Sequence, residues 1–451
     1  MRNDLRRLTA RPPGDGFSRR EILGGSALVL AGLGLSALTG CAPLAGGGSA
    51  QGDELAFWNL LSGGDGMRMK AMVDTVNGQL AGAHIKQTVL SWGSPYYTKL
   101  AMASAGGRAP ELGIMHLSRL AGYAPGGLLD EWDIARLQRY GVTEQSFSGP
   151  TWDRMQFDGG LYAIALDSHA FVRFFNPEVA DAAGVLDSDG KMLPTTSLDE
   201  FIEQADAMRG VTGELGLSYG WLGHPDQMWR LFWTFYSQQG AEMKSEGGRV
   251  AFEKDAFIAS IEGMQKLLDS DAVNRTSDSG FAFSTFTSSK SGEYFSGVWE
   301  LPSLQDSDVP LDASPIPNLF GSDRKAVWGD SHAFVLPHQA SPDEDKREKT
   351  YEAVSLLLKA SAPWGSAGHT PAYLPVVEQP AFKELLPNAH YSETAGYLRY
   401  DPALPFAGSG SEWQSQFGQS VQGALLGRAS AQDALKSFIA MTDTFVRQSV
   451  L

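Results

Sequence analysis

Residues 157–176 read FDGGLYAIALDSHAFVRFFN. The stretch opens with a turn signal at residues 158–160, where glycine takes the positive φ that other residues avoid. The largely apolar runs at residues 161–166 and 170–175 predict two strands that are buried on both faces. A polar break, Asp167 to His169, separates the strands. We expect the chain to pass here from one α/β lobe to another, with the break in the crevice between them. An ordinary solvated loop is the alternative.

The first forty residues have the layout of an export signal. A basic region with six arginines precedes an uncharged stretch from Ile22 to Thr39, and Ser18-Arg19-Arg20 carries a twin arginine. This layout is typical of a secretory signal, and the twin arginine indicates the route that exports folded proteins. Leu38-Thr39-Gly40-Cys41 resembles a bacterial lipobox, which implies that Cys41 becomes the lipidated first residue of the mature chain. An uncleaved membrane anchor is the alternative.

Residues 41–52 predict a flexible tether, because Gly, Ser and Ala dominate from Ala45 to Gln51 and such sequences behave as coil. Cys41 is the only cysteine of the chain. The sequence therefore predicts no intrachain disulfide, no CxxC metal site and no cysteine nucleophile. We expect a domain that is lipid-anchored to the outer face of a bacterial cytoplasmic membrane.

The chain is acidic and long enough for two domains. Its formal net charge is −16, and the first forty residues contribute six arginines against three acidic residues, which leaves −19 for the rest. This charge argues against nucleic acids and other polyanions as partners, and it favours a neutral or cationic ligand. The remaining chain, about 410 residues, is sufficient for two sizeable cores. We find no internal repeat.

The start of the mature chain predicts a parallel sheet. We expect a strand at residues 55–58, a glycine-rich loop at 59–66 and a helix at 67–80. A strand at 85–90, a helix from 95 onward and a strand at 112–115 follow. Ligands in such sheets bind beyond the carboxyl ends of the strands, where loops start at Asn59, Trp92 and His116. The glycine-rich loop lacks the phosphate-binding and dinucleotide patterns. We interpret it as a close approach of backbone to a neutral ligand, with a plain tight turn as the alternative.

Later segments predict more helices and strands. Helices are expected at residues 198–208, 228–239, 256–268, 351–359, 413–426 and 431–446, and strands at residues 293–300 and 327–336. A second polar break, Asp330 to His332, interrupts the last strand. Most rings of the helix at 228–239 are predicted core, whereas Asp226 to Arg230 at its start could face a cleft. Residues 369–375 predict a rigid loop.

Several of these stretches together resemble one family, the extracellular solute-binding proteins of ABC sugar importers (family 1, maltose-binding-protein-like). The matching pieces, in order, are Phe57-Trp58 with its glycine loop, Ala109-Pro110-Glu111-Leu112, residues 158–166, Gly297-Val298-Trp299, Ser314-Pro315-Ile316-Pro317 and Tyr373-Leu374-Pro375. They cover nearly all of the mature chain. Each motif alone is weak, but six in order behind a lipoprotein-like signal form a specific pattern.

The resemblance implies a periplasmic-binding-protein fold of class II, with two discontinuous α/β lobes joined by a multi-strand hinge. Lobe 1 is then expected at residues 53–166 and 331–377, and lobe 2 at residues 167–330 and 378–451. The family captures a solute between closing lobes and delivers it to the transmembrane subunits of an ABC permease. The resemblance thus implies a monomeric protein without enzymatic activity or cofactor.

The resemblance also implies binding residues. Asp167 falls where the family often places a carboxylate on sugar hydroxyls, Trp299 where a ring stacks on a sugar, and Trp413 beside another stacking position. Ser62 to Asp65, which includes Gly64, match a loop that touches ligand. Ser118-Arg119 falls where maltose-type members have a charged pair, and Ser118 departs from that pair because it is not a carboxylate.

The residue types suit a carbohydrate, because a pyranose has C–H faces that pack on rings and hydroxyls that need placed polar partners. The candidate rings are Trp92, Trp299, Trp328, Trp364 and Tyr373, and the candidate hydroxyl partners are Asn59, Asp65, His116, Asp167, His169 and Asp330. Core or hinge packing is the alternative for each tryptophan. A histidine satisfied within the hinge is the alternative for His169 and His332.

Other functions remain open from the sequence. A secreted glycoside hydrolase would need two facing carboxylates, for which Asp167 and Asp330 are the candidates. A polyamine would suit the acids and aromatic rings, whereas a phosphodiester would need clustered Arg and Lys near the glycine loops. A metal would need converging ligands. His116, His169 and His332 lie on three separate loops, so the sequence predicts no metal site.

Overall fold

The computed structural model describes residues 53–321 and 324–449. The predicted export signal, the lipidation site Cys41 and the tether lie outside the described residues. Within the described residues no helix is both long and apolar enough to cross a membrane.

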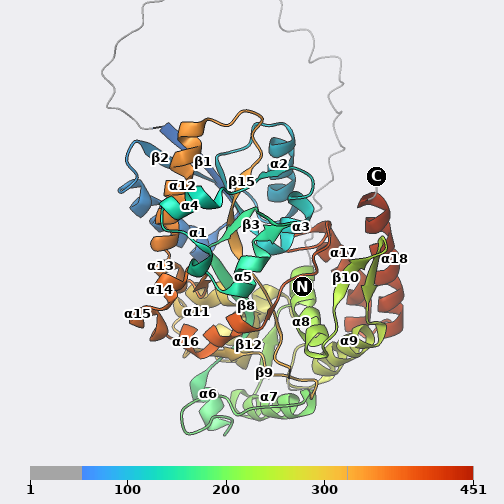
Figure 1. Cartoon of the computed structure of the whole chain (residues 1–451). Helices are drawn as coiled ribbons and strands as arrows, with labels where there is room; N and C mark the ends of the chain where they lie inside the picture. Colours follow the sequence, from blue (N-terminus) through green and yellow to red (C-terminus); the bar gives the residue numbers. More distant parts are fainter. Residues whose placement is uncertain (1–52, 322–323, 450–451) are drawn as a thin grey trace, which may run out of the picture. The chain divides into compact units, whose positions relative to one another are not determined.

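The elements follow the predicted order, with short ones added (Figure 1). Residues 53–166 contain β1 (Asp53–Asn59), α1 (Gly63–Asn77), β2 (Ala83–Val89), α2 (Ser94–Ala105), β3 (Leu112–His116), η1 (Leu117–Arg119), α3 (Leu120–Tyr123), β4 (Leu129–Asp130), α4 (Ile134–Arg139), η2 (Glu144–Ser146), α5 (Gly149–Arg154), β5 (Gln156–Phe157), β6 (Gly160–Leu161) and β7 (Ala163–Ala165). Residues 167–321 contain β8 (Asp167–Phe175), α6 (Pro177–Ala182), α7 (Leu198–Thr212), β9 (Leu215–Tyr219), α8 (Pro225–Gln238), β10 (Met243–Glu246), β11 (Arg249–Phe252), α9 (Lys254–Asp269), α10 (Ser279–Thr287), β12 (Ser291–Gly297), η3 (Val298–Glu300), α11 (Leu301–Gln305) and β13 (Asp312–Pro315). Residues 324–449 contain β14 (Val327–Asp330), β15 (His332–Pro337), α12 (Glu344–Lys359), α13 (Ala362–Gly365), β16 (Thr370–Pro371), α14 (Leu374–Val377), α15 (Pro380–Lys383), α16 (Asn388–Tyr391), η4 (Ser392–Gly396), β17 (Leu398–Arg399), α17 (Glu412–Leu425) and α18 (Ala431–Ser449).

The first lobe is built on a mixed sheet with the order β2-β1-β3-β15-β4, and β7 pairs with β15. The strands β1, β2 and β3 are parallel, as the βαβ pattern predicts, and β15 runs antiparallel to β3. Apolar residues of α1, α2 and α12 pack with this sheet into one core, in which Phe57, Ile114 and Phe334 are fully buried.

The second lobe is built on a sheet with the order β17-β14-β8-β12-β9, and β13 and β16 also pair with β8. Its core takes residues from α7, α8, α9, α17 and α18. The aromatic side chains of α8 lie in this core, as predicted: Trp229, Phe232, Phe235 and Tyr236 are fully buried. Helix α17 packs on α8 through ring contacts. The centroids of Trp229 and Trp413, for example, lie 4.8 Å apart.

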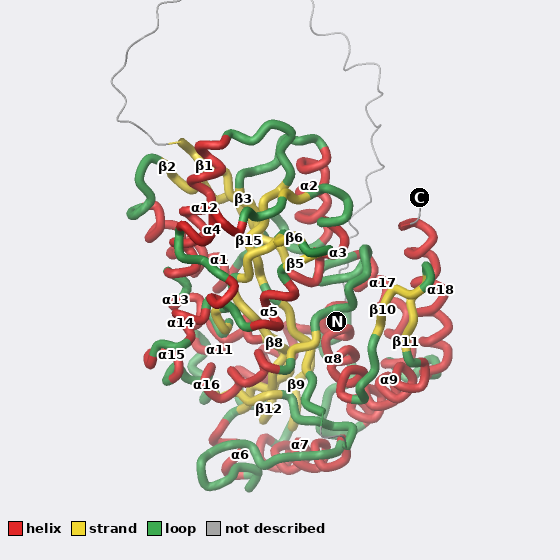
Figure 2. Tube along the Cα trace, viewed as in Figure 1, coloured by secondary structure: helices red, strands yellow, loops and turns green. Residues whose placement is uncertain are grey.

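The chain passes between the sheets at the two predicted polar breaks. β7 belongs to the first sheet and β8 to the second, so one passage lies at Leu166–Asp167. β14 belongs to the second sheet and β15 to the first, so another lies at Ser331. Figure 2 shows β8 and β15 running through the middle of the described chain. The residue limits of the lobes stay a prediction.

Several local expectations differ from the structure. Helix α12, expected to begin at Tyr351, begins at Glu344. Helix α1 begins at Gly63, not Met67, so half of the expected glycine-rich loop is its first turn. Glycine disfavours helix interiors but is tolerated at this end, where Asp65 also complements the helix dipole. The strand expected at 293–300 ends at Gly297, and Trp299 lies in the turn η3. The loop expected at 369–375 contains β16 and the start of α14.

Candidate functional site

A cavity of about 500 Å³ lies between the two lobes. The first lobe lines it with the loop after β1, the start of α1, the loop after β2 and the end of β3, and the second lobe with the start of α8 and the turn η3. The lining residues are Leu60, Leu61, Ser62, Gly63, Gly64, Asp65, Trp92, His116, His169, His224, Asp226, Gln227, Arg230, Ser279, Trp299, Glu300, Ser303, Trp328 and His332. The first-lobe loops lie at the carboxyl ends of parallel strands, the position expected for a ligand.

Strand register brings histidines from distant parts of the sequence to one wall of this cavity. His332 on β15 pairs with His116 on β3, and their rings lie 4.7 Å apart. His169 on β8 pairs with Asp330 on β14, and its ring lies 4.6 Å from that of His332. The expectation that these histidines are scattered on separate loops is therefore wrong, because they lie on strands β3, β8 and β15 and their rings are neighbours.

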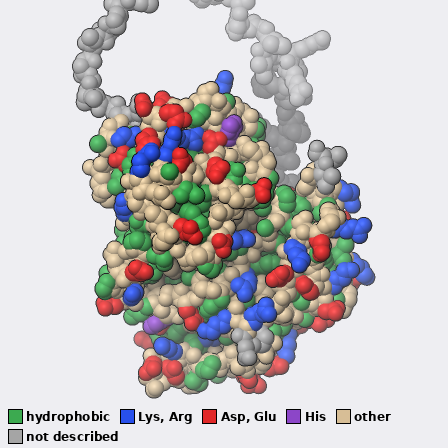
Figure 3. All heavy atoms as spheres, viewed as in Figure 1, with side chains coloured by type: hydrophobic (Ala, Val, Ile, Leu, Met, Phe, Trp, Pro, Cys, Tyr) green, Lys and Arg blue, Asp and Glu red, His purple; other side chains and the backbone are tan. Residues whose placement is uncertain are grey.

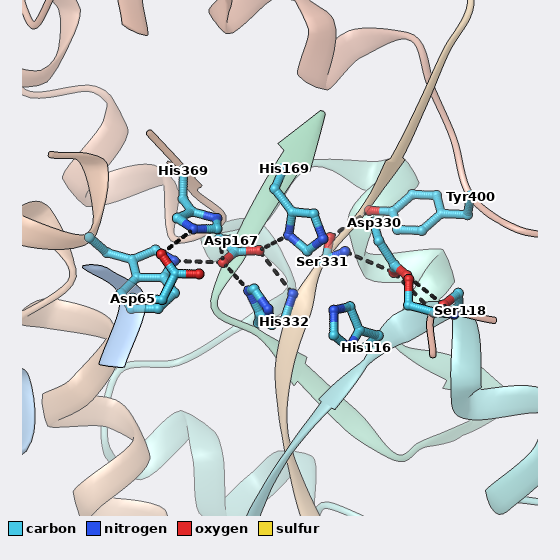
Figure 4. Close-up of polar contacts among 12 residues, drawn as sticks. Asp65, His116, Ser118, Asp167, His169, Asp330, Ser331, His332, His369 and Tyr400 are labelled. Atoms are coloured by element: carbon cyan, nitrogen blue, oxygen red, sulfur yellow. Dashed lines mark hydrogen bonds and ion pairs between the residues drawn. The ribbon is translucent and has the colours of Figure 1, made fainter. Parts of the chain in front are cut away.

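Asp167 lies behind this wall, fully buried, and its oxygens contact several donors (Figure 4). His169 Nδ1 is 3.1 Å from Oδ1, and His332 Nδ1 is 2.8 Å from Oδ2. The backbone N–H of His332 donates to Oδ1 at 2.9 Å, and Trp364 Nε1 donates to Oδ2 at 2.6 Å. His369 Nδ1 lies 3.2 Å from Oδ2, while its Nε2 contacts Asp65 Oδ1 at 3.0 Å.

The charges of this group follow from burial and from its neighbours. Burial opposes ionisation of Asp167, but His332, His369 and His169 outweigh it and hold the pKa of the carboxyl well below its usual range. Burial also opposes a charge on His369, but Asp65 and Asp167 on its two sides raise its pKa to about 10. Burial lowers the pKa of His116 and of His169, so both imidazoles are neutral at pH 7.

The structure brings eight of the thirteen predicted binding residues to the cavity wall. These are Ser62, Gly64, Asp65, Trp92, His116, His169, Trp299 and Trp328. The other five, Asn59, Asp167, Asp330, Tyr373 and Trp413, are buried and not among the lining residues. Asn59 Oδ1 accepts from the backbone of Leu61, and Trp413 packs in the core of the second lobe. Contact of these five with a ligand stays a prediction.

Asp330 ties segments of both lobes together. Its Oδ1 accepts from the backbone N–H groups of Ser118, at 3.1 Å, and Ser331, at 2.9 Å. Its Oδ2 accepts from the hydroxyls of Ser118 and Ser409. Ser118 precedes α3 in the first lobe and Ser409 precedes α17, so this carboxylate joins three distant segments.

Several cavity residues escape sequence reasoning. Arg230 on α8 pairs with Asp226 at 2.7 Å, and its guanidinium lies 4.4 Å from the ring centre of Trp299 and 4.9 Å from that of Trp328. The sequence indicates only that the start of this helix could face a cleft. Glu300 also lines the cavity, and burial raises its pKa. His369 is not recognisable as a site residue, because its partners are hundreds of residues away in the sequence.

Asp401 holds Trp328, one of the cavity-lining residues, in place. Its Oδ1 accepts from the indole N–H groups of both Trp229 and Trp328, each at 2.7 Å. Burial, with a smaller contribution from Asp330, raises its pKa to about 7, although the two indoles and Arg230 oppose this. The folded state therefore binds this proton more tightly than the unfolded state does. Stability should fall as pH rises from about 4 to about 7.

We expect Asp401→Asn to reduce this pH dependence, because an amide oxygen still accepts from both indoles and carries no charge. From pH 5 to pH 8 the wild type should lose up to about 3 kcal/mol more unfolding free energy than the variant. Urea unfolding of both proteins at the two pH values measures the difference. All other titrating groups are common to both proteins, so identical pH profiles would contradict the assignment.

A larger hollow, about 660 Å³, lies elsewhere in the second lobe, beside β13 and α16. Its lining residues, among them Arg173, Met192, Asp312 and His390, all come from that lobe. A ligand there would contact one lobe only and could not favour closure of the two. We therefore take the smaller cavity between the lobes as the candidate site.

Comparison with solved structures identifies the fold. MalE3 of T. maritima, solved with maltose, superimposes with a TM-score of 0.72 at 16% identity, covering 87% of this chain and 99% of that one. The GacH receptor of Streptomyces glaucescens GLA.O, solved unliganded and with acarbose, gives 0.71 at 15% identity, with 88% and 98% covered. The chain has the two-lobed fold of ABC solute-binding proteins.

This solute-binding fold confirms the predicted fold class, two α/β lobes of the periplasmic-binding-protein type. A third similar structure is an ABC transporter solute-binding protein from Thermotoga lettingae TMO bound with α-D-tagatose, with a TM-score of 0.71 at 15% identity and 87% and 100% covered. No protein-family model and no curated protein sequence matches the chain.

Proposed function

We propose that the chain is the substrate-binding component of an ABC importer and holds a sugar or oligosaccharide in the cavity between its lobes. The observation that carries the proposal is the composition of the cavity wall. Indole rings from both lobes, Trp92 and Trp299, stand among carboxylates, imidazoles and the start of a helix. Aromatic rings pack on the C–H faces of sugars, and the polar groups exchange hydrogen bonds with hydroxyls.

The two lobes contribute different parts of this wall, which suits capture by closure. Ser62 to Asp65 and Trp92 belong to the first lobe, whereas Trp299 and Asp226 belong to the second. A ligand that contacts both sets binds the closed form better than the open form, and its differential affinity shifts the population toward closure. The closed form then docks on the permease, which opens it and receives the solute.

The charges in the cavity favour a neutral ligand over a cation. Asp226 pairs with Arg230, and Asp65 pairs with His369, whose raised pKa keeps it charged at pH 7. Burial raises the pKa of Glu300, and the nearby charge of Arg230 opposes this rise. Acidic and basic side chains are interspersed on the face that Figure 3 shows. A polyamine would therefore find few carboxylates without a cationic partner in the described site.

The remaining parts of the proposal concern location and chemistry. Export through the twin-arginine signal and lipid attachment at Cys41 would hold the protein on the outer face of the cytoplasmic membrane. We further propose that the protein performs no reaction. Both oxygens of Asp167 and of Asp330 are already engaged with internal donors. Neither carboxylate is placed to attack or protonate a glycosidic bond.

Calorimetric melting of the purified chain tests the proposal. The panel holds mono- and oligosaccharides, polyamines and glycerophosphodiesters, each at low and at high salt. A ligand at one hundred times its dissociation constant should add about 2.7 kcal/mol to the unfolding free energy. We expect this shift with one class of sugar at both salt concentrations, because binding of a neutral ligand is not screened.

Other outcomes of the screen would overturn the proposal. A shift with a polyamine that weakens at high salt would assign a cationic solute to the same cavity. Hydrolysis of an oligosaccharide by the purified chain, detected by chromatography of the products, would show that the chain is an enzyme. No shift with any sugar in the panel would remove carbohydrate as the ligand class.

A further inference from the structure

Four side chains converge at the passages between the two sheets: Asp167, His169, His332 and His369, hereafter the Asp167 cluster (Figure 4). One ligand-type atom from each lies within 4.8 Å of all the others, and all four residues are buried. Asp167 and His169 come from the passage into β8, and His332 from the passage into β15. His369 precedes β16, which pairs with β8. The cluster thus gathers three separate segments of the chain.

We infer that the Asp167 cluster is a binding site for a divalent transition metal ion, with Zn²⁺ as the ion that fits best. Three imidazoles and one carboxylate are a donor set that suits zinc and does not suit Mg²⁺ or Ca²⁺, which require oxygen ligands. This inference does not depend on which solute occupies the cavity.

The spacing of the ligand atoms fits such an ion. The Nδ1 atoms of His169, His332 and His369 lie 3.1, 2.8 and 3.2 Å from the nearest oxygen of Asp167. A tetrahedral site with bonds of about 2.0–2.1 Å places neighbouring ligand atoms about 3.3 Å apart. The rings of His169, His332 and His369 are 4.6 to 5.5 Å from one another, so small movements would direct all three Nδ1 atoms at one ion.

The contacts around the cluster are those that orient metal ligands. Asp65 accepts from Nε2 of His369, which directs Nδ1 of the same ring toward Asp167. Trp364 Nε1 and the backbone N–H of His332 hold the carboxylate in place. Such carboxylate–histidine pairs and second hydrogen bonds are typical around bound zinc. Nδ1 of His369 is buried and lies 3.2 Å from Oδ2 of Asp167, and a bound ion would take the place of the proton on this nitrogen.

The position of the cluster indicates a resident ion rather than a transported one. Asp167 and His369 are fully buried and are not among the lining residues of the cavity, whereas His169 and His332 are. Asp167, His169 and His332 sit at the two passages between the sheets, so opening of the lobes would not release the ion. We infer that the ion holds the three segments at fixed spacing while the lobes move about them.

The alternative is a cluster held by hydrogen bonds alone, in which Asp167 accepts directly from the imidazoles. The two arrangements predict different results with metal. Without a site, added zinc or cobalt would bind weakly at exposed histidines. With a site, the chain would take up one ion, and replacement of a cluster residue would abolish this uptake.

Cobalt titration of the purified, chelator-treated chain distinguishes them, because tetrahedral Co²⁺ gives strong visible absorption bands. We expect one Co²⁺ per chain with a tetrahedral spectrum, displaced by one equivalent of Zn²⁺. His369→Ala should abolish the bands. The matched control is His390→Ala, because His390 also pairs with a carboxylate, Asp312 at 2.8 Å, but lies outside the cluster. Uptake that is absent, or that is equal in the two variants, would overturn the site.

A second measurement covers the case in which His369→Ala does not fold. X-ray absorption of the zinc-loaded wild type should show a shell of three nitrogens and one oxygen at about 2.0–2.1 Å with imidazole scattering. A shell of six oxygens, or one without imidazole, would overturn the inference. The zinc-loaded chain should also melt several degrees above the chelated chain, because an ion that binds only the folded state stabilises it.

Discussion

Replacing Trp299 by alanine is expected to weaken binding of the sugar about 30- to 150-fold while leaving the fold intact. Such a loss corresponds to about 2–3 kcal/mol, as for a central aromatic residue in a binding site. Trp299 lies in the turn η3, half-buried, and lines the cavity beside Trp328, whose ring is 6.1 Å away. Its removal takes away stacking area and one of the rings beside the guanidinium of Arg230.

Titration calorimetry with the sugar found in the screen measures this effect. Trp299→Phe is the graded variant, because it keeps a flat ring and should retain most of the affinity. Phe281→Ala is the control, since Phe281 is exposed and not among the lining residues of the cavity. If Trp299→Ala bound the sugar as tightly as the wild type, the cavity wall described here would not be the sugar site.

Replacing Gly368 by alanine is expected to lower the unfolding free energy by about 3 kcal/mol or more. Gly368 has a φ of +94°, a conformation that strains any residue with a Cβ. An added Cβ would also press against the carbonyl of Val298, at the start of the turn that carries Trp299. Tyr391 donates to the Gly368 carbonyl at 2.7 Å, so the backbone here has little freedom to move.

Urea unfolding compares this variant with Gly184→Ala. Gly184 also has a positive φ, +69°, but nothing lies within 4 Å of the position of its Cβ. The control therefore shows the backbone strain alone, about 1 kcal/mol. Equal losses in the two variants would contradict the close contact with Val298. Gly368→Ala should also weaken sugar binding, since a shifted Val298 displaces Trp299.

Much of the fold can be predicted from local patterns. The Asp158-Gly159 turn, the two apolar runs that follow it and the interruption at Asp167 are all visible in sequence, and the structure has strands and a passage between sheets at these places. The parallel start of the first sheet follows from strands alternating with helices. Local patterns succeed here because buried strands and amphipathic helices each impose their own periodicity.

The composition of the site is harder to predict, because it depends on pairing between distant strands. The backbone of His332 donates to Asp167 across 165 positions, and Trp364 donates to the same residue across 197. No local pattern reveals that β15 places His332 opposite His116. The same histidines therefore appear scattered in the sequence and gathered in the structure.

Aromatic residues illustrate a second limit. Trp92, Trp299 and Trp328 line the cavity, whereas Trp413 and Tyr373 pack in the cores of the two lobes. The sequence around these five residues is compatible both with contact to a ligand and with packing in a core. Whether a ring meets ligand or core depends on the path of the backbone around it, which residue type alone does not determine.

The placement of Trp364 has an optical consequence. Its indole N–H donates to Asp167 at 2.6 Å, and its ring stacks on that of His369 at 4.8 Å between centroids. Indole emission responds to nearby charges and to quenching imidazolium groups. The passages between the lobes thus contain an intrinsic fluorophore, distinct from the tryptophans that line the cavity. Emission of a Trp364→Phe variant, subtracted from that of the wild type, would report on these passages without any added label.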